Sequence, residues 1–260
     1  MMSKTEVLEI AGNVTSWLIE AGDKLRPGVN HISKVDTKSS RNDLVTNEDV
    51  SIEKLLDGHI RQTYPDAQIM GEENKAERPQ NLHGLVFFVD PIDGTLNFVR
   101  KHDCFASMIG VYYDGEPVFG GILDVMNKDL YWGGPLLGVY RNDVKLDAVA
   151  DCPLADGLIG ASWRQLFTNR FNLGTIGYHA SGVRILGSAG LEFVLLLNGR
   201  HVGYVSTLNP WDFAAGSILA EALGFETGSV SGYRLSLLRP ADYVVMTPNA
   251  MKTFRKLAYA

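Results

Sequence analysis

Two aspartates stand where a buried apolar run ends, and they are the residues best placed to do chemistry. The run, LVFFV at residues 85–89, is typical of a buried strand, and the next six residues read DPIDGT. Pro91 fixes the chain direction, and Gly94 permits a tight turn with close approach of a ligand to the backbone. Exposed N–H groups at such a turn favour a bound anion. We expect Thr95 to cap a helical turn that follows.

The two carboxylates of this turn, Asp90 and Asp93, would repel an anion unless a cation lay between them. Hard carboxylate oxygens are the ligands that magnesium-like ions prefer. One interpretation is therefore a metal on Asp90 and Asp93, with phosphate on the turn. Spacing alone does not decide between this site and a pair of turn aspartates, because Asp is common in turns.

Three further acidic segments offer chemistry, although each has a simpler explanation by itself. GEE at residues 71–73 is either another metal ligand or a solvated acidic loop. DLVTNED at residues 43–49 leads into a helix, where Asp49 either favours the helix dipole or supports a site. NPWD at residues 209–212 precedes an apolar helix, where Asp212 is most simply a cap and Trp211 a core residue.

Composition excludes several classes of protein. The 260 residues carry a net charge of -6 and no block of Lys or Arg that would bind nucleic acid. There is no CxxC pair, no H-E-x-x-H zinc motif, no G-x-S-x-G elbow and no Walker-type phosphate loop. No signal-peptide h-region and no apolar run of about 18 residues is present, so we expect a cytoplasmic protein with no membrane partner.

Elements of two kinds must position these residues. Strands over 105–113, 118–124, 130–133 and 137–142 are punctuated by Gly and Asp/Asn, which predicts an antiparallel meander after the strand at 85–89. Strands at 157–162, 202–205 and 243–246 alternate with helices farther along. Helices are predicted from the first residues to Pro27-Gly28, and over 48–64, 189–197, 211–223 and 249–259. The polar segment 34–42 is expected to be a mobile loop.

These elements predict an α+β half over residues 1–150 and an α/β half over residues 151–260. The boundary falls near Asp151-Cys152-Pro153. No linker marks it, so we expect the halves to share a core and form one unit.

Together, the four segments resemble the inositol monophosphatase family of lithium-sensitive, metal-dependent phosphatases. DPIDGTLNF at 90–98 is similar to its first signature, WDFAAG at 211–216 is similar to its second, and the other two segments fall in the family order upstream. The resemblance covers about residues 5–250. It implies an alternating α/β/α/β/α layered sandwich, as in inositol monophosphatase and fructose-1,6-bisphosphatase. It also implies a homodimer, two or three Mg²⁺ ions, and a small phosphorylated metabolite as substrate.

The resemblance also implies roles for individual residues. Thr95, paired with Asp49, would orient the nucleophilic water, and Glu72 is the third catalytic residue. Metal ligands would be Glu72, Asp90, Asp93, Asp212 and the carbonyl of Ile92, with Asp90 bridging two ions. Phosphate and substrate contacts would come from Asp93, Gly94, Thr95, Gly187, Ser188, Ala189, Asp212 and Lys38. Two metals about 3.5–4 Å apart can activate water and stabilise the leaving oxygen, so no covalent nucleophile is needed.

One departure from the family leaves the substrate open. Members specific for inositol phosphates often carry a Glu seven residues before the Asp of the second signature, and here that position is Val205. Valine cannot accept a hydroxyl hydrogen bond, so discrimination between alcohols would fall. The substrate is inositol monophosphate or, alternatively, the 2′-phosphate of NADP(H), fructose 1,6-bisphosphate or a 3′-phosphoadenosine nucleotide. A catalytically silent metal- and phosphate-binding protein is the third alternative, against which the intact acidic set argues.

Overall fold

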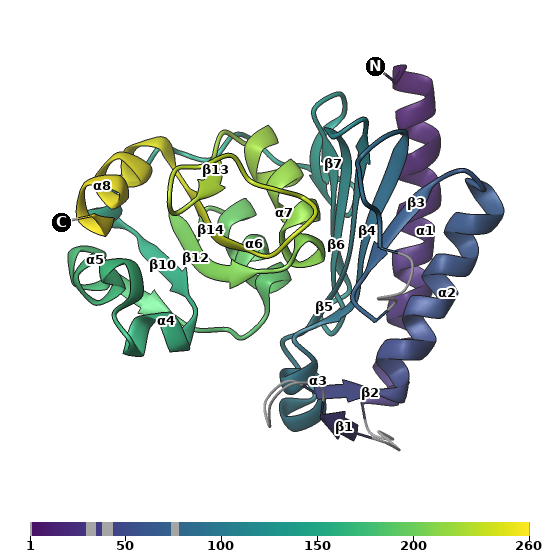
Figure 1. Cartoon of the computed structure of the whole chain (residues 1–260), viewed down its shortest axis with the longest axis horizontal. Coiled ribbons are helices and arrows are strands. Elements are labelled where there is room, and N and C mark those ends of the chain that lie inside the picture. The colour runs from purple at the N-terminus through teal and green to yellow at the C-terminus, as the bar shows by residue number, and fades with distance from the viewer. Residues whose placement is uncertain (1, 30–34, 38–43, 74–77, 260) are drawn as a thin grey trace.

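Two long helices form one outer layer of the molecule. The computed structural model describes residues 2–29, 35–37, 44–73 and 78–259. Helix α1 (Lys4–Gly28) buries Val7, Val14 and Leu18 at helical spacing, and a capping box between Ser3 and Glu6 starts it. Helix α2 (Asn47–Thr63) is capped by Thr46. Both helices were predicted, and they pack side by side on one face of a sheet (Figure 1).

That sheet has seven strands in the order β3-β4-β5-β6-β7-β8-β9. Strand β3 is parallel to β4, and the remaining pairs are antiparallel, which confirms the predicted meander. Strand β4 continues through Asp93 rather than ending at Asp90, with a register shift between the two aspartates. The bounds are β3 (Gln68–Gly71), β4 (Leu85–Asp93), β5 (Ala106–Tyr113), β6 (Glu116–Asp124), β7 (Asp129–Gly134), β8 (Gly138–Arg141) and β9 (Val144–Lys145).

The segment predicted as a loop over 34–42 is partly a strand. Strand β1 (Val35–Thr37) pairs antiparallel with β2 (Leu44–Thr46), which leads directly into α2. The loop prediction is therefore wrong for residues 35–37, where backbone pairing outweighs the polar composition. Its other residues lie outside the described part of the chain.

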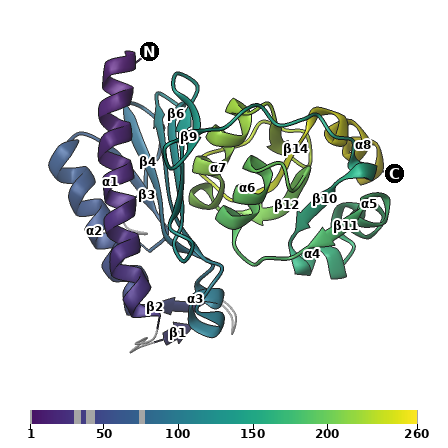
Figure 2. The ribbon, with the colours of Figure 1, turned by 180° about the vertical axis from the view of Figure 1, so that it is seen from behind.

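Two helices form the middle layer behind the seven-stranded sheet. Helix α7 (Pro210–Ala222) packs on β5 and β6, and α6 (Ala189–Leu197) packs on α7 (Figure 2). Glycines make this close packing possible. A Cβ on Gly110 would lie 2.8 Å from the nitrogen of Ala215, and one on Gly120 would lie 2.5 Å from its oxygen.

A second sheet and further helices complete the fold. Its strand order is β11 (Gly182–Arg184), β10 (Leu158–Ala161), β12 (Gly203–Leu208), β14 (Ala241–Met246) and β13 (Glu226–Ser229). The outer layer holds the helices α4 (Trp163–Phe167), α5 (Leu173–His179) and α8 (Pro248–Ala258), with the 3-10 turns η2 (Leu154–Asp156) and η3 (Arg170–Asn172). The layers run α/β/α/β/α, as predicted (Figure 1). Between β4 and β5 lies α3 (Thr95–Lys101).

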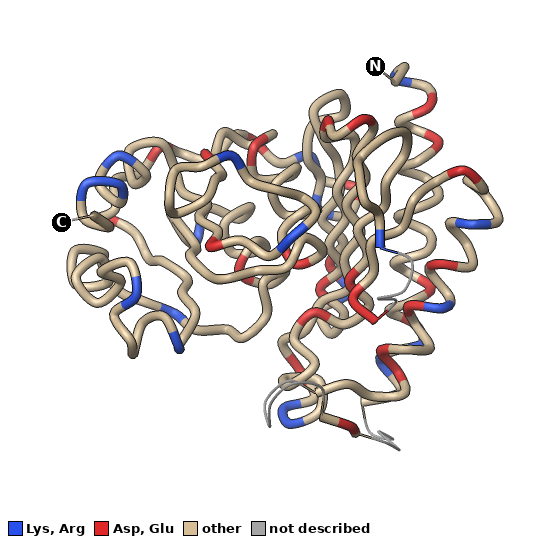
Figure 3. The backbone as a smooth tube through the Cα atoms, in the orientation of Figure 1, with Lys and Arg blue, Asp and Glu red and all other residues tan. Residues whose placement is uncertain are grey.

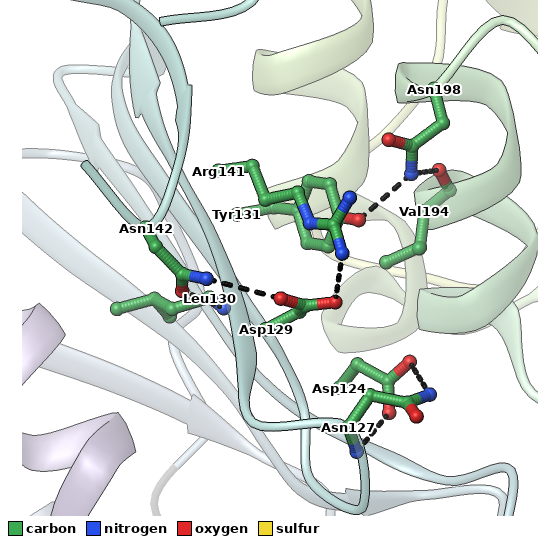
Figure 4. Close-up of polar contacts among 9 residues, drawn as sticks. All are labelled: Asp124, Asn127, Asp129, Leu130, Tyr131, Arg141, Asn142, Val194 and Asn198. Carbon is green, nitrogen blue, oxygen red and sulfur yellow. Dashed lines mark hydrogen bonds and ion pairs between the residues drawn. The ribbon is translucent and has the colours of Figure 1, made fainter. Parts of the chain in front are cut away.

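Apolar and polar contacts join the two predicted halves. Met108 and Ile122 pack in one cluster with Phe193 and Phe213 of the middle helices. Figure 4 shows a polar link, in which Asn198 of α6 donates to the hydroxyl of Tyr131 on β7 at 2.8 Å. In the described residues, no helix combines the length and apolar character needed to cross a membrane.

Candidate functional site

Nearly all the residues that the sequence predicted to be functional line one cavity. It has a volume of about 880 Å³ and lies where β4, α3 and α4 meet the starts of α6 and α7. Its lining includes Glu72, Asp90, Ile92, Asp93, Gly94, Thr95, Gly187, Ser188, Ala189 and Asp212. Lys38 lies outside the described residues. A slightly larger cavity of about 980 Å³, beside Tyr233 and Ser217, contains none of these residues.

The turn after β4 depends on a glycine in the left-handed region. Gly94 has a φ of 91°, and an added Cβ would lie 3.1 Å from the Cβ of Ser188 and 3.3 Å from the oxygen of Gly187. Gly94 therefore lets the turn approach the start of α6 closely. It also occupies the cap position of α3, so the prediction that Thr95 is the cap was wrong. Helix α3 is therefore capped one residue earlier than the sequence predicted.

Thr95 instead contacts Asp49, its partner according to the family resemblance, and the backbone of Ile92. Its hydroxyl lies 3.0 Å from Oδ1 of Asp49 and 3.1 Å from the carbonyl oxygen of Ile92. Oδ2 of Asp49 accepts from the backbone N–H of Thr46 at 2.7 Å and from its hydroxyl at 2.6 Å. Asp49 thus caps α2 with one oxygen and holds Thr95 with the other.

Asp93 faces the beginning of α6. Its Oδ1 accepts from the N–H of Ala189 at 2.9 Å, and its Oδ2 accepts from the N–H of Gly190 at 2.7 Å and from the hydroxyl of Ser188. Ser188 also caps α6 by accepting from the N–H of Leu191 at 3.2 Å. The segment 187–189, predicted to contact substrate, is therefore used first to hold Asp93.

Asp212 likewise combines a cap with a place in the cavity. Its Oδ2 accepts from the N–H of Asn209 at 2.7 Å, which closes a capping box at the start of α7. Burial raises the pKa of Asp212 to about 7, against the opposing effect of the Asn209 N–H. The side chain of Asp212 is thus partly buried where it lines the cavity.

Asp90 is the most strongly perturbed member of the acidic group. Burial raises its pKa well above the usual range, and the charges of Glu72, Asp93 and Asp212 raise it further. Burial raises the pKa of Asp93 as well, although its bonds to α6 counteract part of the rise. Carboxylates gathered without a positive charge resist ionisation, which is the situation a bound cation would relieve.

The carboxylate oxygens that line the cavity are of the type that binds a divalent cation, although the carboxylates do not converge on a single point. Within the described ranges, no three acidic, imidazole or thiol side chains converge as they would on a bound ion. The bonds of Asp93 to α6 and of Asp212 to Asn209 turn these groups partly aside. Among the residues that the structure describes, however, none forms a hydrogen bond with the buried Oδ1 of Asp90. A buried carboxylate oxygen needs a proton or a cation, so this atom supports a metal site.

Sequence reasoning missed two residues that support the acidic group. Arg78 donates to the backbone oxygen of Glu72 at 3.3 Å, and its guanidinium lies 4.5 Å from the centre of the Trp211 ring. It thereby ties the end of β3 to the start of α7. Glu53, buried on α2, accepts from the N–H of Glu73 at 2.9 Å. No local motif marks either residue, because each acts across a long separation in sequence.

The interpretation of Val205 as a missing substrate contact stays a prediction. Its side chain is fully buried and packs in a core cluster with Ile159 and Val244. The neighbouring residues Tyr204 and Ser206 line the cavity instead. Val205 itself is not among the β12 residues that line this cavity.

Comparisons with known proteins agree with this geometry. The model of the inositol monophosphatase family matches residues 4–257. An inositol-1-monophosphatase of Bacillus subtilis is 33% identical over 258 residues, covering 97% of this chain and 96% of the relative. The structure of inositol monophosphatase-II from Staphylococcus aureus has a TM-score of 0.85 and 30% identity, covering 95% of this chain and 92% of that chain. SaIMPase-II has also been solved with bound 2′AMP, at the same TM-score and identity, covering 95% of this chain and 93% of that chain.

Proposed function

Since the chain belongs to the inositol monophosphatase family and is a phosphomonoesterase, we propose that it hydrolyses inositol monophosphate or a similar small phosphate ester with the aid of Mg²⁺. The observation that carries the proposal is the unpartnered, buried Oδ1 of Asp90 in a cavity shared with Glu72 and Asp212. The Thr95–Asp49 hydrogen bond beside it supports the same reaction.

The proposed metal ligands are the carboxylates of Glu72, Asp90, Asp93 and Asp212, with the carbonyl of Ile92. When bound, divalent cations lower the pKa of a coordinated water and neutralise phosphate charge. The number of ions, two or three, remains a prediction from the family resemblance.

The residues of the chain would then orient the attacking water. The Thr95 hydroxyl donates its hydrogen to Asp49, and its oxygen can accept a hydrogen from that water through a lone pair. Asp49 cannot turn away, because its other oxygen is held by the cap of α2. Thr95 would therefore fix the direction of attack, and backbone N–H groups of Gly94 and Thr95 would hold the phosphate.

The relatives support a phosphate ester with a small alcohol. Inositol-1-monophosphatase is the name of the Bacillus subtilis relative, and SaIMPase-II has been solved with inositol monophosphate at 28% identity. The silent-protein alternative is disfavoured because the Thr95–Asp49 pair is intact. A cytoplasmic location stays a prediction from the sequence, and a homodimer and sensitivity to millimolar lithium stay predictions from the family resemblance.

Phosphate release with Mg²⁺ across a substrate panel tests the proposal. We expect turnover of inositol 1-phosphate, loss of turnover on chelation, and a large loss in Asp93→Asn. Activity that is unchanged by both treatments would contradict the metal mechanism. No release from any ester would favour the silent protein. Sedimentation of the purified chain tests the dimer.

A further inference from the structure

Asn97 lies on α3 behind Thr95 and takes no part in the reaction as proposed above. Its side-chain amide donates to the backbone oxygen of Cys104 at 2.8 Å and to that of Leu186 at 2.8 Å. The second bond joins the two halves of the chain, and Figure 3 shows that Asp and Glu positions gather near the seam between these halves. Asn97 therefore ties α3 to a segment of the second half beside the acidic group.

The two hydrogens of the Asn97 amide are both committed to backbone oxygens. A side-chain amide has two N–H hydrogens and one carbonyl oxygen. Asn97 lines the cavity, but what its amide can still offer there is an acceptor oxygen, which has no hydrogen to give to a phosphate. Asn97 is thus better suited to hold the backbone than to contact the substrate.

Leu186 is held at both of its backbone polar groups. Its carbonyl oxygen accepts from Asn97, and its N–H donates to Oε1 of Glu192 on α6 at 3.1 Å. Glu192 is itself buried. Gly187 follows with a φ of 75°, and a Cβ added there would lie 3.4 Å from Nδ2 of Asn97. The segment 186–187 is therefore fixed directly before α6 begins.

The residues that follow this segment are those that hold Asp93. The hydroxyl of Ser188 and the N–H groups of Ala189 and Gly190 donate to its carboxylate. A carboxylate has about four acceptor sites, so these bonds leave one site of Oδ1 for a cation. The direction of that site depends on where α6 begins, and the beginning of α6 depends on Leu186.

We propose that Asn97 is a positioning residue for the metal site. It holds Leu186, and through Leu186 the beginning of α6, so that Asp93 keeps one oxygen site directed at the cation. This inference rests on the proposed function, because it concerns the metal that the phosphatase reaction would use.

The test measures the Kd of Mn²⁺ by electron paramagnetic resonance, with no ester present. Mn²⁺ is a paramagnetic probe that prefers the same oxygen ligands as Mg²⁺. Asn97→Ala should raise this Kd about 10-fold, at the lower end of the ~10–100-fold that loss of a partner of a metal ligand costs. Asn97→Leu removes the N–H groups but keeps the volume of the side chain. It should give the same rise, and it replaces the alanine variant if that variant does not fold.

A double variant tests whether Asn97 acts through the segment that holds Asp93. Ser188→Ala removes the hydroxyl bonded to Asp93 and should by itself raise the Kd about 10-fold. Adding Asn97→Ala to Ser188→Ala should then raise the Kd by less than about 3-fold more, because residues in one chain of contacts do not contribute additively. A further rise of about 10-fold would show that Asn97 acts independently of this segment, which would overturn the proposal.

Asn198→Ala is the matched control. The Asn198 amide also donates twice, to the hydroxyl of Tyr131 at 2.8 Å and to the carbonyl oxygen of Val194 at 2.7 Å. It caps the other end of α6 and is not among the residues that line the cavity. We expect this variant to lower Tm about as much as Asn97→Ala does, but to leave the Kd of Mn²⁺ unchanged. An unchanged Kd in Asn97→Ala, or an equal rise in both asparagine variants, would contradict the positioning role.

Metal binding and phosphate release together distinguish failure of this inference from failure of the proposed function. A wild-type protein that binds Mn²⁺ but releases phosphate from no ester contradicts the proposed function, and the Kd values of the variants still decide the role of Asn97. A wild-type protein that binds no Mn²⁺ contradicts both.

Discussion

At the scale of single residues, the sequence left open whether Asp49 and Asp212 cap helices or belong to the site, and the structure shows that the two roles are compatible. Asp49 and Asp212 each cap a helix with one carboxylate oxygen, while the other oxygen of Asp49 accepts from Thr95 and Asp212 lines the cavity. A carboxylate has about four acceptor sites, so one side chain can do both. The cap also restricts the rotation of the side chain, which leaves the second oxygen pre-oriented for chemistry.

Thr95 offers the sharpest test at this scale. Thr95→Ala removes the hydroxyl that contacts Asp49 and Ile92, and with it the group proposed to orient water. We expect kcat for inositol 1-phosphate to fall about 100-fold or more, since positioned proton-transfer groups contribute ~10²–10⁴-fold. Thr95→Ser keeps the hydroxyl and should retain most of the turnover. An alanine variant that folds normally by circular dichroism and keeps half its kcat would exclude this role.

The acidic group also predicts how stability depends on pH when no cation is bound. Burial raises the pKa of Asp212 from 3.8 to about 7. Between these values the folded protein holds more protons than the unfolded chain, so the free energy of unfolding falls as pH rises.

Thermal melts with a chelator should therefore show Tm decreasing from pH 5 to pH 8. Added Mg²⁺ should remove most of the decrease, because the cation replaces the protons. Without metal, Asp212→Asn should reduce the decrease, and the part due to Asp90 and Asp93 should remain. A chelated wild-type protein whose Tm rises over this range would show that the carboxyls are ionised and stabilised by other means.

At the scale of elements, the turn between β4 and α3 is the part most sensitive to backbone geometry. Gly94→Ala places a methyl group at a φ of 91° and within 3.1 Å of Ser188, whereas Gly84→Ala has a φ of 69° and open space around it. Both should lose about 1–2 kcal/mol of unfolding free energy from the left-handed backbone. Only Gly94→Ala should also lower kcat/KM, since it displaces the start of α6 that holds Asp93. Urea unfolding and phosphate release measure the two effects separately. Equal activity in both variants would show that close approach at Gly94 is unimportant.

The sequence predicts the elements that contain a continuous run of regularly spaced apolar residues, and it misses short elements that lack one. Helix α6 was predicted with its observed bounds, because its apolar run ends at Asn198-Gly199. The region over 163–184 was not predicted, because α4, α5 and β11 are short and their neighbours include residues with positive φ, such as Asn169 and Phe171. The site followed the same rule. Residues within motifs were found, whereas Arg78 and Glu53 were missed because they act across the fold.

At the scale of the whole molecule, the layers place the acidic centre between two sheets rather than within either half. Asp90 and Asp93 come from β4 of the first sheet, and Asp212 begins a helix packed between the two sheets. Relative movement of the halves would therefore separate the carboxylates. The mixed apolar cluster around Met108 and Phe193 opposes such movement.

Unfolding should accordingly occur in one cooperative transition, and Phe193 provides the test. Its ring is fully buried, lies 6.1 Å from that of Tyr204 and 5.9 Å from that of Tyr243, and belongs to the cluster shared with Met108. Phe193→Ala should lower the unfolding free energy by about 3–5 kcal/mol, whereas Phe167→Ala, at an 80% exposed position, should change it by less than about 0.5 kcal/mol. In calorimetry, Phe193→Ala should move a single peak to lower temperature, with calorimetric and van't Hoff enthalpies still equal. Two peaks, of which only one shifts, would mean that the halves unfold independently. The site between them would then depend on their docking rather than on one core.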